Sequence, residues 1–251
     1  MKKKVMLTIL DVREIALDTV EMILENSYIA ETAVPGQFLH ISVDGHTLRR
    51  PISIASIDRK QHTITILFKK VGDGTEQLAA YQNGMSLSAL GPSGNGFHYE
   101  ASSLKTVLLI GGGIGVPPLY NLGTELIQQG INVISVLGFQ SKDCVFYEDK
   151  FQELGRTIVV TDDGSYGQQG FVTDHLPDKA LCDYYFTCGP IPMLRAVTNA
   201  LHEKSGSISL EERMGCGVGA CLACVIPADN ADGYRKICKD GPVFGASEVM
   251  I

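Results

Sequence analysis

The sequence predicts a multidomain protein that joins a β-rich part, an α/β part and a small cysteine-bearing C-terminal part. Three observations support this fold class. Short β-type runs fill residues 1–99, uninterrupted apolar strands alternate with helices over residues 100–207, and four of the seven cysteines lie in residues 208–251. A chain of 251 residues is long enough for such a division.

Residues 1–99 carry the first of these patterns. Runs such as QFLHISV, ISIASID and HTITILFKKV alternate apolar with polar residues, and turn residues separate them. This alternation is typical of antiparallel strands that bury one face. We therefore predict a small antiparallel β-barrel.

Residues 100–207 have a different texture. The strand TVLLIGGG leads into the helix PPLYNLGTELIQQG, and the later strands NVISVLGF, TIVVTDDG and YYFTCGP precede a last helix, PMLRAVTNALHEK. Apolar strands that alternate with helices predict a parallel sheet covered on both faces. The remaining residues, 208–251, are too few to form a good hydrophobic core of their own unless a cross-link stabilises them.

Composition excludes several classes of function. The net charge is -7 and there is no long Lys/Arg cluster, which argues against nucleic acid or an anionic membrane as a partner. The N-terminus begins like a secretion signal, but Asp11, Arg13 and Glu14 interrupt its apolar run. No stretch approaches the roughly 18 apolar residues of a membrane span. We therefore expect a soluble, cytoplasmic protein.

The cysteines of the C-terminal part have the spacing C-x4-C-x2-C-x13-C. They are Cys216, Cys221, Cys224 and Cys238. The first three match the plant-type 2Fe-2S spacing, and the glycines between them let backbone N-H groups reach the sulfurs. Structural zinc is the alternative, although it usually draws on C-x2-C pairs, and unligated or disulfide-bonded cysteines are a further one. The scattered Cys144, Cys182 and Cys188 read as small buried hydrophobes.

A glycine loop follows the strand that ends at Ile110. The helix after it opens with Pro117 and Pro118, which suits a first turn. Backbone N-H groups at such a junction can bind a pyrophosphate. The loop departs from G-x-G-x-x-G, because the third position counted from Gly111 is Val116, so a tight turn without a ligand stays an alternative. The loops TDDGSYGQQGF and TCGPIPML also follow strands, where ligands of open α/β sheets bind.

Two stretches of the first part suit a flavin nucleotide. In LRRPISIAS, Arg50 can hold a pyrophosphate as a fork, and the Ser53 hydroxyl can hydrogen-bond a flavin ring. In KVGDGTEQLAAY, Gly74 and Thr75 stand near a helix N-terminus. The alternatives are a solvated arginine pair and a capped helix without a ligand.

Taken in order, R-P-I-S and G-T, then G-G-G-I-G-V-P-P, C-G-P and the cysteine segment, the sequence resembles the ferredoxin reductase-like family. Within that family it is similar to the electron-transfer subunits of bacterial class 1B dihydroorotate dehydrogenases, over nearly all 251 residues. The resemblance implies FAD in the barrel domain (1–99), NAD in the α/β domain (100–207) and a 2Fe-2S cluster in the C-terminal domain (208–251).

The resemblance also implies site residues. The FAD contacts are Arg50, Pro51, Ile52, Ser53, Leu67, Phe68, Lys69, Gly74 and Thr75. The NAD contacts are Gly111, Gly112, Gly113, Gly115, Cys188, Gly189 and Pro190, with Cys188 as the catalytic candidate beside the nicotinamide. The cluster ligands are the four cysteines of the C-terminal part. Many reductases of this fold end in an aromatic residue that covers the flavin, whereas this chain continues into the cysteine segment.

The implied partner is an FMN-containing dihydroorotate dehydrogenase catalytic subunit, in a heterotetramer with two copies of each subunit. Electrons from dihydroorotate would reach NAD+ through the cluster and FAD, because a flavin links one-electron and two-electron carriers. One alternative is the electron-transfer subunit of an NAD(P)H:ferredoxin reductase or sulfhydrogenase. Another is a non-catalytic interaction module stapled by zinc.

Two further expectations concern polar residues. After NVISVLGF come Gln140, Ser141 and Lys142, with no clear acidic residue for a ribose 2'-OH, so the preference for NAD comes only from the resemblance. The histidines form no cluster, and we expect each to be an ordinary surface residue or a satisfied one. They are His40, His46, His62, His98, His175 and His202.

Overall fold

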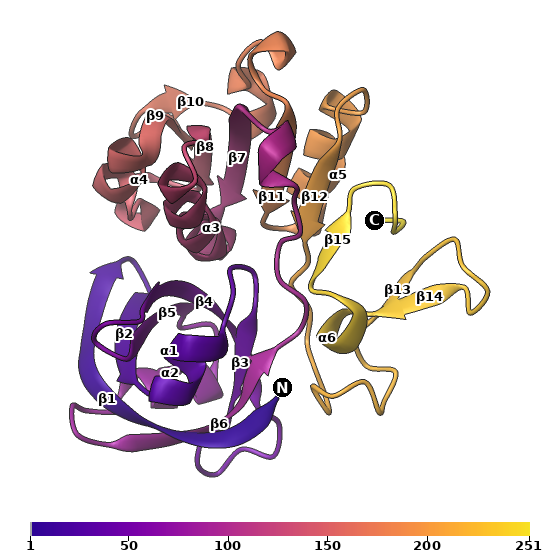
Figure 1. Cartoon of the computed structure of the whole chain (residues 1–251). Coiled ribbons are helices and arrows are strands. Elements are labelled where there is room, and N and C mark those ends of the chain that lie inside the picture. The colour runs from indigo at the N-terminus through magenta and orange to yellow at the C-terminus, as the bar shows by residue number, and fades with distance from the viewer. Residues whose placement is uncertain (1) are drawn as a thin grey trace.

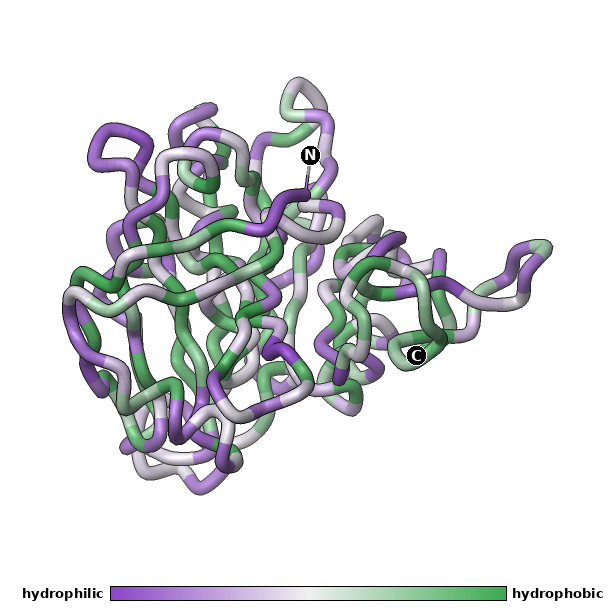
Figure 2. Tube along the Cα trace, turned by 90° about the horizontal axis from the view of Figure 1, so that it is seen from below, coloured by the Kyte–Doolittle hydropathy of each residue, from purple (hydrophilic) through white to green (hydrophobic). Residues whose placement is uncertain are grey.

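The structure, a computed structural model, describes residues 2–251. Figure 1 shows three parts: a barrel built from the N-terminal strands, an α/β part above it, and a C-terminal segment beside both. In the view of Figure 2 this C-terminal segment forms a lobe next to the rest of the chain. Within residues 2–251, no helix is both long enough and apolar enough to cross a membrane.

The first part is a closed barrel of antiparallel strands in the order β1-β2-β5-β4-β3-β6. The strands are β1 (Lys3–Ala16), β2 (Thr19–Glu25), β3 (Phe38–Ile41), β4 (Arg50–Asp58), β5 (Thr63–Lys69) and β6 (Ser86–Ser93). Two short helices, α1 (Ser27–Thr32) and α2 (Asp73–Ala79), interrupt them. Alternate apolar residues such as Leu7, Ile9 and Ile66 fill the barrel core. The predicted barrel is confirmed.

The second part is a seven-stranded sheet in the order β10-β9-β8-β7-β11-β12-β15, parallel except for its last strand. Its strands are β7 (Thr106–Gly112), β8 (Asn132–Phe139), β9 (Gly155–Thr161), β10 (Gln168–Gln169), β11 (Tyr184–Cys188), β12 (Gly206–Ser209) and β15 (Val243–Gly245). The helices are α3 (Val116–Gln128), α4 (Glu148–Leu154) and α5 (Ile191–Ala200).

Both faces of this sheet are covered, as the apolar strands predict. In β7, Leu109 belongs to the core that contains Leu119 of α3, while its neighbour Leu108 belongs to the core that contains Val197 of α5. Successive strand residues point to opposite faces, so a strand buried on both sides is apolar throughout. The predicted doubly covered parallel sheet is confirmed.

The C-terminal segment is tied to both other parts. It contains the hairpin β13 (Val225–Pro227) and β14 (Tyr234–Lys236), the short helix α6 (Ile237–Asp240), and β15, which pairs with β12. Its apolar core includes Phe38 of the barrel and Leu194 of α5. The segment therefore shares a core with its neighbours, which a stretch this short requires. Because β12 runs across residues 207 and 208, the division of the chain at that point stays a prediction.

A buried carboxylate joins the barrel to the α/β part. Glu21 in β2 is 2% exposed and accepts hydrogen bonds from the Tyr147 hydroxyl and, at 2.8 Å, from Arg13 Nε. The Lys150 ammonium lies 3.3 Å from the same carboxylate. Burial opposes ionisation of Glu21, but these donors outweigh it and lower the pKa of the carboxyl. The two parts are thus held together at a second place, away from the sheet edge.

We predict that Glu21→Gln lowers the free energy of unfolding by about 2 kcal/mol at pH 7, because it removes the charge from a buried network. A lowered pKa stabilises the fold above the carboxyl's unfolded pKa, and that stabilisation is lost as the pH falls through the folded value. The difference from wild type should therefore shrink in acid. Urea denaturation at pH 7 and at pH 3.5 measures this. Glu14→Gln, at an exposed ion pair, is the control, and equal midpoints for wild type and Glu21→Gln at pH 7 would contradict the prediction.

Candidate functional site

A cleft of ≈ 860 Å³ opens where the three parts of the chain meet. Its walls come from β4, β5 and the turn before α2, from Ile114 of the glycine loop, and from residues 210–214. A volume of this size is typical of cofactor sites. All nine predicted FAD contacts line the cleft: Arg50, Pro51, Ile52, Ser53, Leu67, Phe68, Lys69, Gly74 and Thr75. The structure therefore brings together residues that lie in three separate stretches of the sequence.

Two of these residues meet directly. The Arg50 guanidinium lies so close to Gly74 that a Cβ there would be 1.9 Å from Arg50 Nη2. Its nitrogens also contact the Leu48 carbonyl and, at 3.0 Å, His46 Nδ1. The guanidinium is therefore held against a bare stretch of backbone at the edge of the cleft. A planar cation in such a place can bind a pyrophosphate with two parallel hydrogen bonds.

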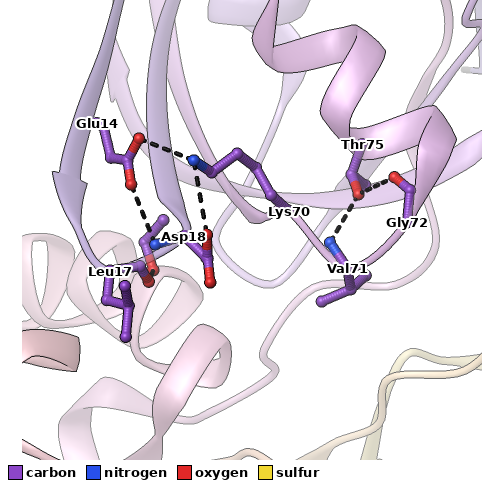
Figure 3. Close-up of polar contacts among 8 residues, drawn as sticks. Glu14, Leu17, Asp18, Lys70, Val71, Gly72 and Thr75 are labelled. Atoms are coloured by element: carbon purple, nitrogen blue, oxygen red, sulfur yellow. Dashed lines mark hydrogen bonds and ion pairs between the residues drawn. The ribbon is translucent and has the colours of Figure 1, made fainter.

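Thr75 has a different part in the same wall. Its hydroxyl donates to the Gly72 carbonyl and accepts from the Val71 N-H, each at 2.9 Å (Figure 3). Nearby, the Lys70 ammonium forms an ion pair with Glu14 at 2.8 Å. The hydroxyl is thus used to close the turn before α2. Contact between Thr75 and FAD stays a prediction, and its clearest contribution in the structure is to the shape of the turn.

The predicted NAD residues lie at one edge of the sheet. Cys188 at the end of β11 is in register with Gly111 at the end of β7. Beyond the strands, a Cβ on Gly115 would lie 2.4 Å from the Cys188 carbonyl carbon, and one on Gly112 would lie 3.2 Å from Pro190 Cδ. The glycine loop and the C-G-P loop therefore pack backbone to backbone at the carboxyl edge of adjacent parallel strands, which is where dinucleotides bind in such sheets.

Cys188 is 1% exposed, and burial raises the pKa of its thiol, so the thiol is neutral. Its Sγ lies 4.0 Å from Oε1 of Glu211, which lines the cleft. Loss of hydration among the surrounding protein groups raises the pKa of Glu211 to about 7, although part of the residue stays exposed. Sequence reasoning missed Glu211. The signal that marks it is its position just after β12, at the carboxyl edge of the sheet.

Two other findings bear on the sequence-based expectations. Residues 210–214 line the cleft and the C-terminal Ile251 does not, so the segment before the cysteines covers this side of the cleft.

Cys144 and Cys182 are 5% and 2% exposed, which confirms them as small buried side chains.

The four cysteines of the C-terminal segment lie in two pairs. The sulfurs of Cys216 and Cys221 are 3.3 Å apart, and the thiol of Cys238 interacts with that of Cys224. In residues 2–251, no group of three or more His, Cys, Asp or Glu side chains is arranged to hold a metal ion. A 2Fe-2S cluster takes two protein ligands on each iron, whereas structural zinc takes four around one ion. The paired arrangement therefore fits the cluster better than zinc.

Backbone N-H groups point at these sulfurs. Val218 and Cys221 donate to Cys216 Sγ at 3.4 and 3.3 Å, and Gly219 donates to Cys238 Sγ at 3.2 Å. Burial alone would raise the pKa of Cys216, but these donors lower it to about 6. Burial and the neighbouring Cys224 raise the pKa of Cys238 to about 12. The loop thus provides the donors that an anionic cluster requires.

Glycine is needed in this loop for two reasons. Gly217 has a φ of +66°, and a Cβ there would lie 2.2 Å from His40 Nδ1. Gly219 has a φ of +81° and packs against the methylene stem of Lys239. Both positions combine a left-handed backbone with a close neighbouring side chain. Each of these two features disfavours any residue other than glycine.

The expectation for His40 was wrong. Its side chain is 0% exposed, and neither ring nitrogen has a hydrogen-bond partner among the described residues. The register of β3 places the ring against Gly217 of the cysteine loop, a contact that a single-strand pattern does not reveal. Burial, with the charges of Arg49 and Lys2, lowers the pKa of His40 to about 4, so the ring is neutral at pH 7.

Known proteins provide an independent comparison. Residues 211–250 match the family model described as the iron-sulfur cluster binding domain of dihydroorotate dehydrogenase B, and residues 109–199 match the oxidoreductase NAD-binding domain. The NADH-dependent reduced ferredoxin-NADP oxidoreductase has a similar structure, with a TM-score of 0.88 and 28% identity over 97% of this chain and 89% of that one. An Amycolatopsis cytochrome P450 reductase shares the fold, with a TM-score of 0.69 and 22% identity over 80% of this chain and 66% of that one.

Curated relatives match over the whole chain. The dihydroorotate dehydrogenase B (NAD(+)) electron transfer subunit of Shouchella clausii is 50% identical over 100% of this chain and 99% of its own length. The protein of the same name from Bacillus mycoides is 47% identical over 100% of both chains. Identity at this level over full length shows the family. The chain belongs to the electron transfer subunits of dihydroorotate dehydrogenase B.

Proposed function

We propose that this chain carries electrons from a dihydroorotate dehydrogenase catalytic subunit to NAD+, by way of a 2Fe-2S cluster and FAD, in pyrimidine biosynthesis. One observation carries the proposal: a single cleft, lined by all the predicted flavin contacts, adjoins both the glycine loop through Ile114 and the cysteine segment through residues 210–214. FAD, when bound, exchanges hydride with a nicotinamide and single electrons with an iron-sulfur centre. A flavin site that adjoins both the glycine loop and the cysteine segment suits that exchange.

The protein's own groups bind and orient the cofactors. In this proposal the Arg50 guanidinium neutralises the FAD pyrophosphate at the edge of the cleft. The backbone from Gly111 to Gly115 receives the pyrophosphate of NAD, and the neutral Cys188 thiol forms the wall beside the nicotinamide. The four cysteine thiolates hold the cluster, and the N-H groups of their loop stabilise its negative charge.

The catalytic partner is proposed to dock where the cysteines approach the surface. Val218 and Leu222, in the loop that carries Cys216 and Cys221, are 47% and 61% exposed. Exposed apolar side chains beside a redox centre favour a protein interface at that face. We further propose an FMN-containing partner, two copies of each subunit in the complex, and a cytoplasmic location, which the absence of disulfides among the seven cysteines supports.

Co-expression with the candidate catalytic subunit tests the function. We expect the two chains to co-purify as a yellow-brown complex that reduces NAD+ when dihydroorotate is added. A tight complex without that activity would favour the ferredoxin-type alternative, and a colourless, zinc-containing protein would contradict both redox functions. Leu222→Glu should weaken the complex, whereas Leu181→Glu, at a 51% exposed leucine of the α/β part, should not.

The structure also suggests what selects NAD over NADP. The Asp162 N-H donates to the Phe139 carbonyl at 3.0 Å, and the Asp163 N-H donates to that of Gln140 at 3.4 Å. The turn after β9 therefore brings two carboxylates beside the loop after β8, whose first residues, Gln140, Ser141 and Lys142, are not acidic. Asp163 is occupied by Ser165, which leaves Asp162 as the freer carboxylate. A carboxylate there would repel a ribose 2'-phosphate.

We predict that Asp162→Ser raises the ratio of kcat/KM for NADPH to that for NADH by about tenfold, the effect of about 1.4 kcal/mol of relieved repulsion. Steady-state dye reduction with both nucleotides measures the ratio. Asp149→Ser, which removes the same charge from α4, is the matched control. An unchanged ratio in Asp162→Ser would show that the ribose lies elsewhere.

A further inference from the structure

Two lysine side chains hold the cysteine loop by its carbonyl groups. Lys2 Nζ donates to the Gly217 carbonyl at 2.7 Å, and Lys236 Nζ donates to the Gly219 carbonyl at 2.7 Å. Lys2 stands just before the first strand of the barrel, and Lys236 ends β14, two residues before Cys238. The two ammonium groups thus reach one short loop from different parts of the chain.

Neither ammonium has a carboxylate partner in the part of the chain that the structure describes. Within residues 2–251, none of the ion pairs closer than 4.0 Å includes Lys2 or Lys236. Both side chains are partly buried, and burying a cation without an anion is costly. Burial lowers the pKa of Lys2, and the charges of Cys238 and Cys216 oppose that shift. The negative charge that Lys2 faces is therefore that of the cysteine sulfurs, and Lys236 lies two residues before one of these cysteines, Cys238.

The Lys2 contact is reinforced from the barrel. Gly217, whose carbonyl Lys2 binds, also packs against the buried ring of His40 in β3. The loop between Cys216 and Cys221 is in this way seated on the barrel by a hydrogen bond and by packing. Since the barrel also forms most of the cleft, Lys2 keeps a fixed position relative to both sites.

We propose that Lys2 and Lys236 set the reduction potential of the cluster, as positioning residues that act through charge; this rests on the proposed function. Four thiolates and two sulfides leave the cluster negative, and each reduction adds one electron to it. A fixed positive charge nearby favours the more negative state, so it raises the potential. The cluster would then accept an electron more readily when the barrel and the cysteine loop are docked than when they are apart.

The test is a redox titration of the full-length chain, followed by the EPR signal of the reduced cluster. Iron, sulfide and FAD are quantified first in wild type and in every variant. Lys2→Gln and Lys236→Gln remove the charge and keep a donor group, whereas Lys2→Arg and Lys236→Arg keep the charge. Lys4→Gln removes an exposed charge from the same end of the barrel and is the matched control.

We expect each glutamine variant to shift the midpoint to a more negative potential. The equilibrium constant for cluster reduction should fall by up to about tenfold, which is about 59 mV for a one-electron couple. The arginine variants and Lys4→Gln should titrate like wild type, and added salt should narrow the differences because it screens charge.

Three results would overturn the inference. Glutamine variants with full iron content and an unchanged midpoint would do so while leaving the electron-transfer function intact. Loss of iron from the glutamine variants alone would assign the lysines to holding the cluster and not to tuning it. A wild-type chain without iron and sulfide would overturn the proposed function together with the inference.

Discussion

Cys221→Ser removes the cluster absorbance and the EPR signal, yet leaves NADH-dependent reduction of a two-electron dye within about twofold of wild type. The expectation follows from geometry, since Cys221 pairs with Cys216 at 3.3 Å in the C-terminal segment and does not line the cleft. A serine hydroxyl is a poor iron ligand at neutral pH, because it stays protonated where a thiol ionises. Dihydroorotate-dependent NAD+ reduction by the complex should fall to background.

Visible spectra, iron analysis and dye assays on one preparation check this result. Cys144→Ser, which changes a buried thiol of the α/β part, should keep both the cluster and the dye activity. If Cys221→Ser lost dye reduction while its FAD stayed bound, the order of carriers from NADH to FAD to cluster would be wrong.

Gly115→Ala is expected to lower kcat/KM for NADH by at least about 100-fold, because displacements of about 1 Å at a reacting pair cost that much. An added Cβ would lie 2.4 Å from the carbonyl carbon and oxygen of Cys188 and 2.6 Å from the Gly189 nitrogen. These are backbone atoms held in the sheet, so they cannot rotate away as a side chain would. The glycine loop and the C-G-P loop must separate, and the proposed NAD site opens with them.

Gly130→Ala, in the turn after α3 and outside the glycine loop, is the control. No atom lies within 4 Å of its added Cβ, and its φ of +77° costs about 1 to 2 kcal/mol in local strain alone. NADH turnover, FAD content and thermal midpoint measured together separate a lost site from a lost fold. Normal NADH turnover by a folded Gly115→Ala protein would place the nucleotide somewhere other than this loop.

Some of the fold could be predicted because its signals are local. The alternation in runs such as HTITILFKKV reports a half-buried strand, and the apolar run TVLLI reports a strand buried on both faces. The C-x4-C-x2-C spacing also indicates its chemistry locally, since the predicted ligands and the N-H donors to their sulfurs lie within a few residues of one another. These patterns depend on the alternation of side chains along a strand or on short spacings between cysteines. Both can be read directly from a sequence.

Other features depend on contacts that no local pattern encodes. The hydrogen bond from Lys2 to Gly217 joins residues 215 positions apart, and the contact of Tyr147 with Glu21 spans 126 positions. His40 looks like an ordinary polar residue of an alternating strand, and only the docking of the cysteine loop makes it a buried neighbour of Gly217. Asp162 likewise reaches the loop after β8 only because β9 lies next to β8 in the sheet.

The sequence by itself therefore determined the kinds of element, the spacing of the predicted cysteine ligands and the family, because each is carried by residue type and short spacing. Tertiary structure alone decided that Arg50 meets Gly74, that Glu211 faces the Cys188 thiol, and that one cleft adjoins both the glycine loop and the segment before the cysteines. The physical reason is that strand order and domain docking, set by the burial of faces against one another, bring these groups together. The hydrophobic pattern of a strand or helix predicts which of its faces is buried, but it does not predict which other element that face packs against.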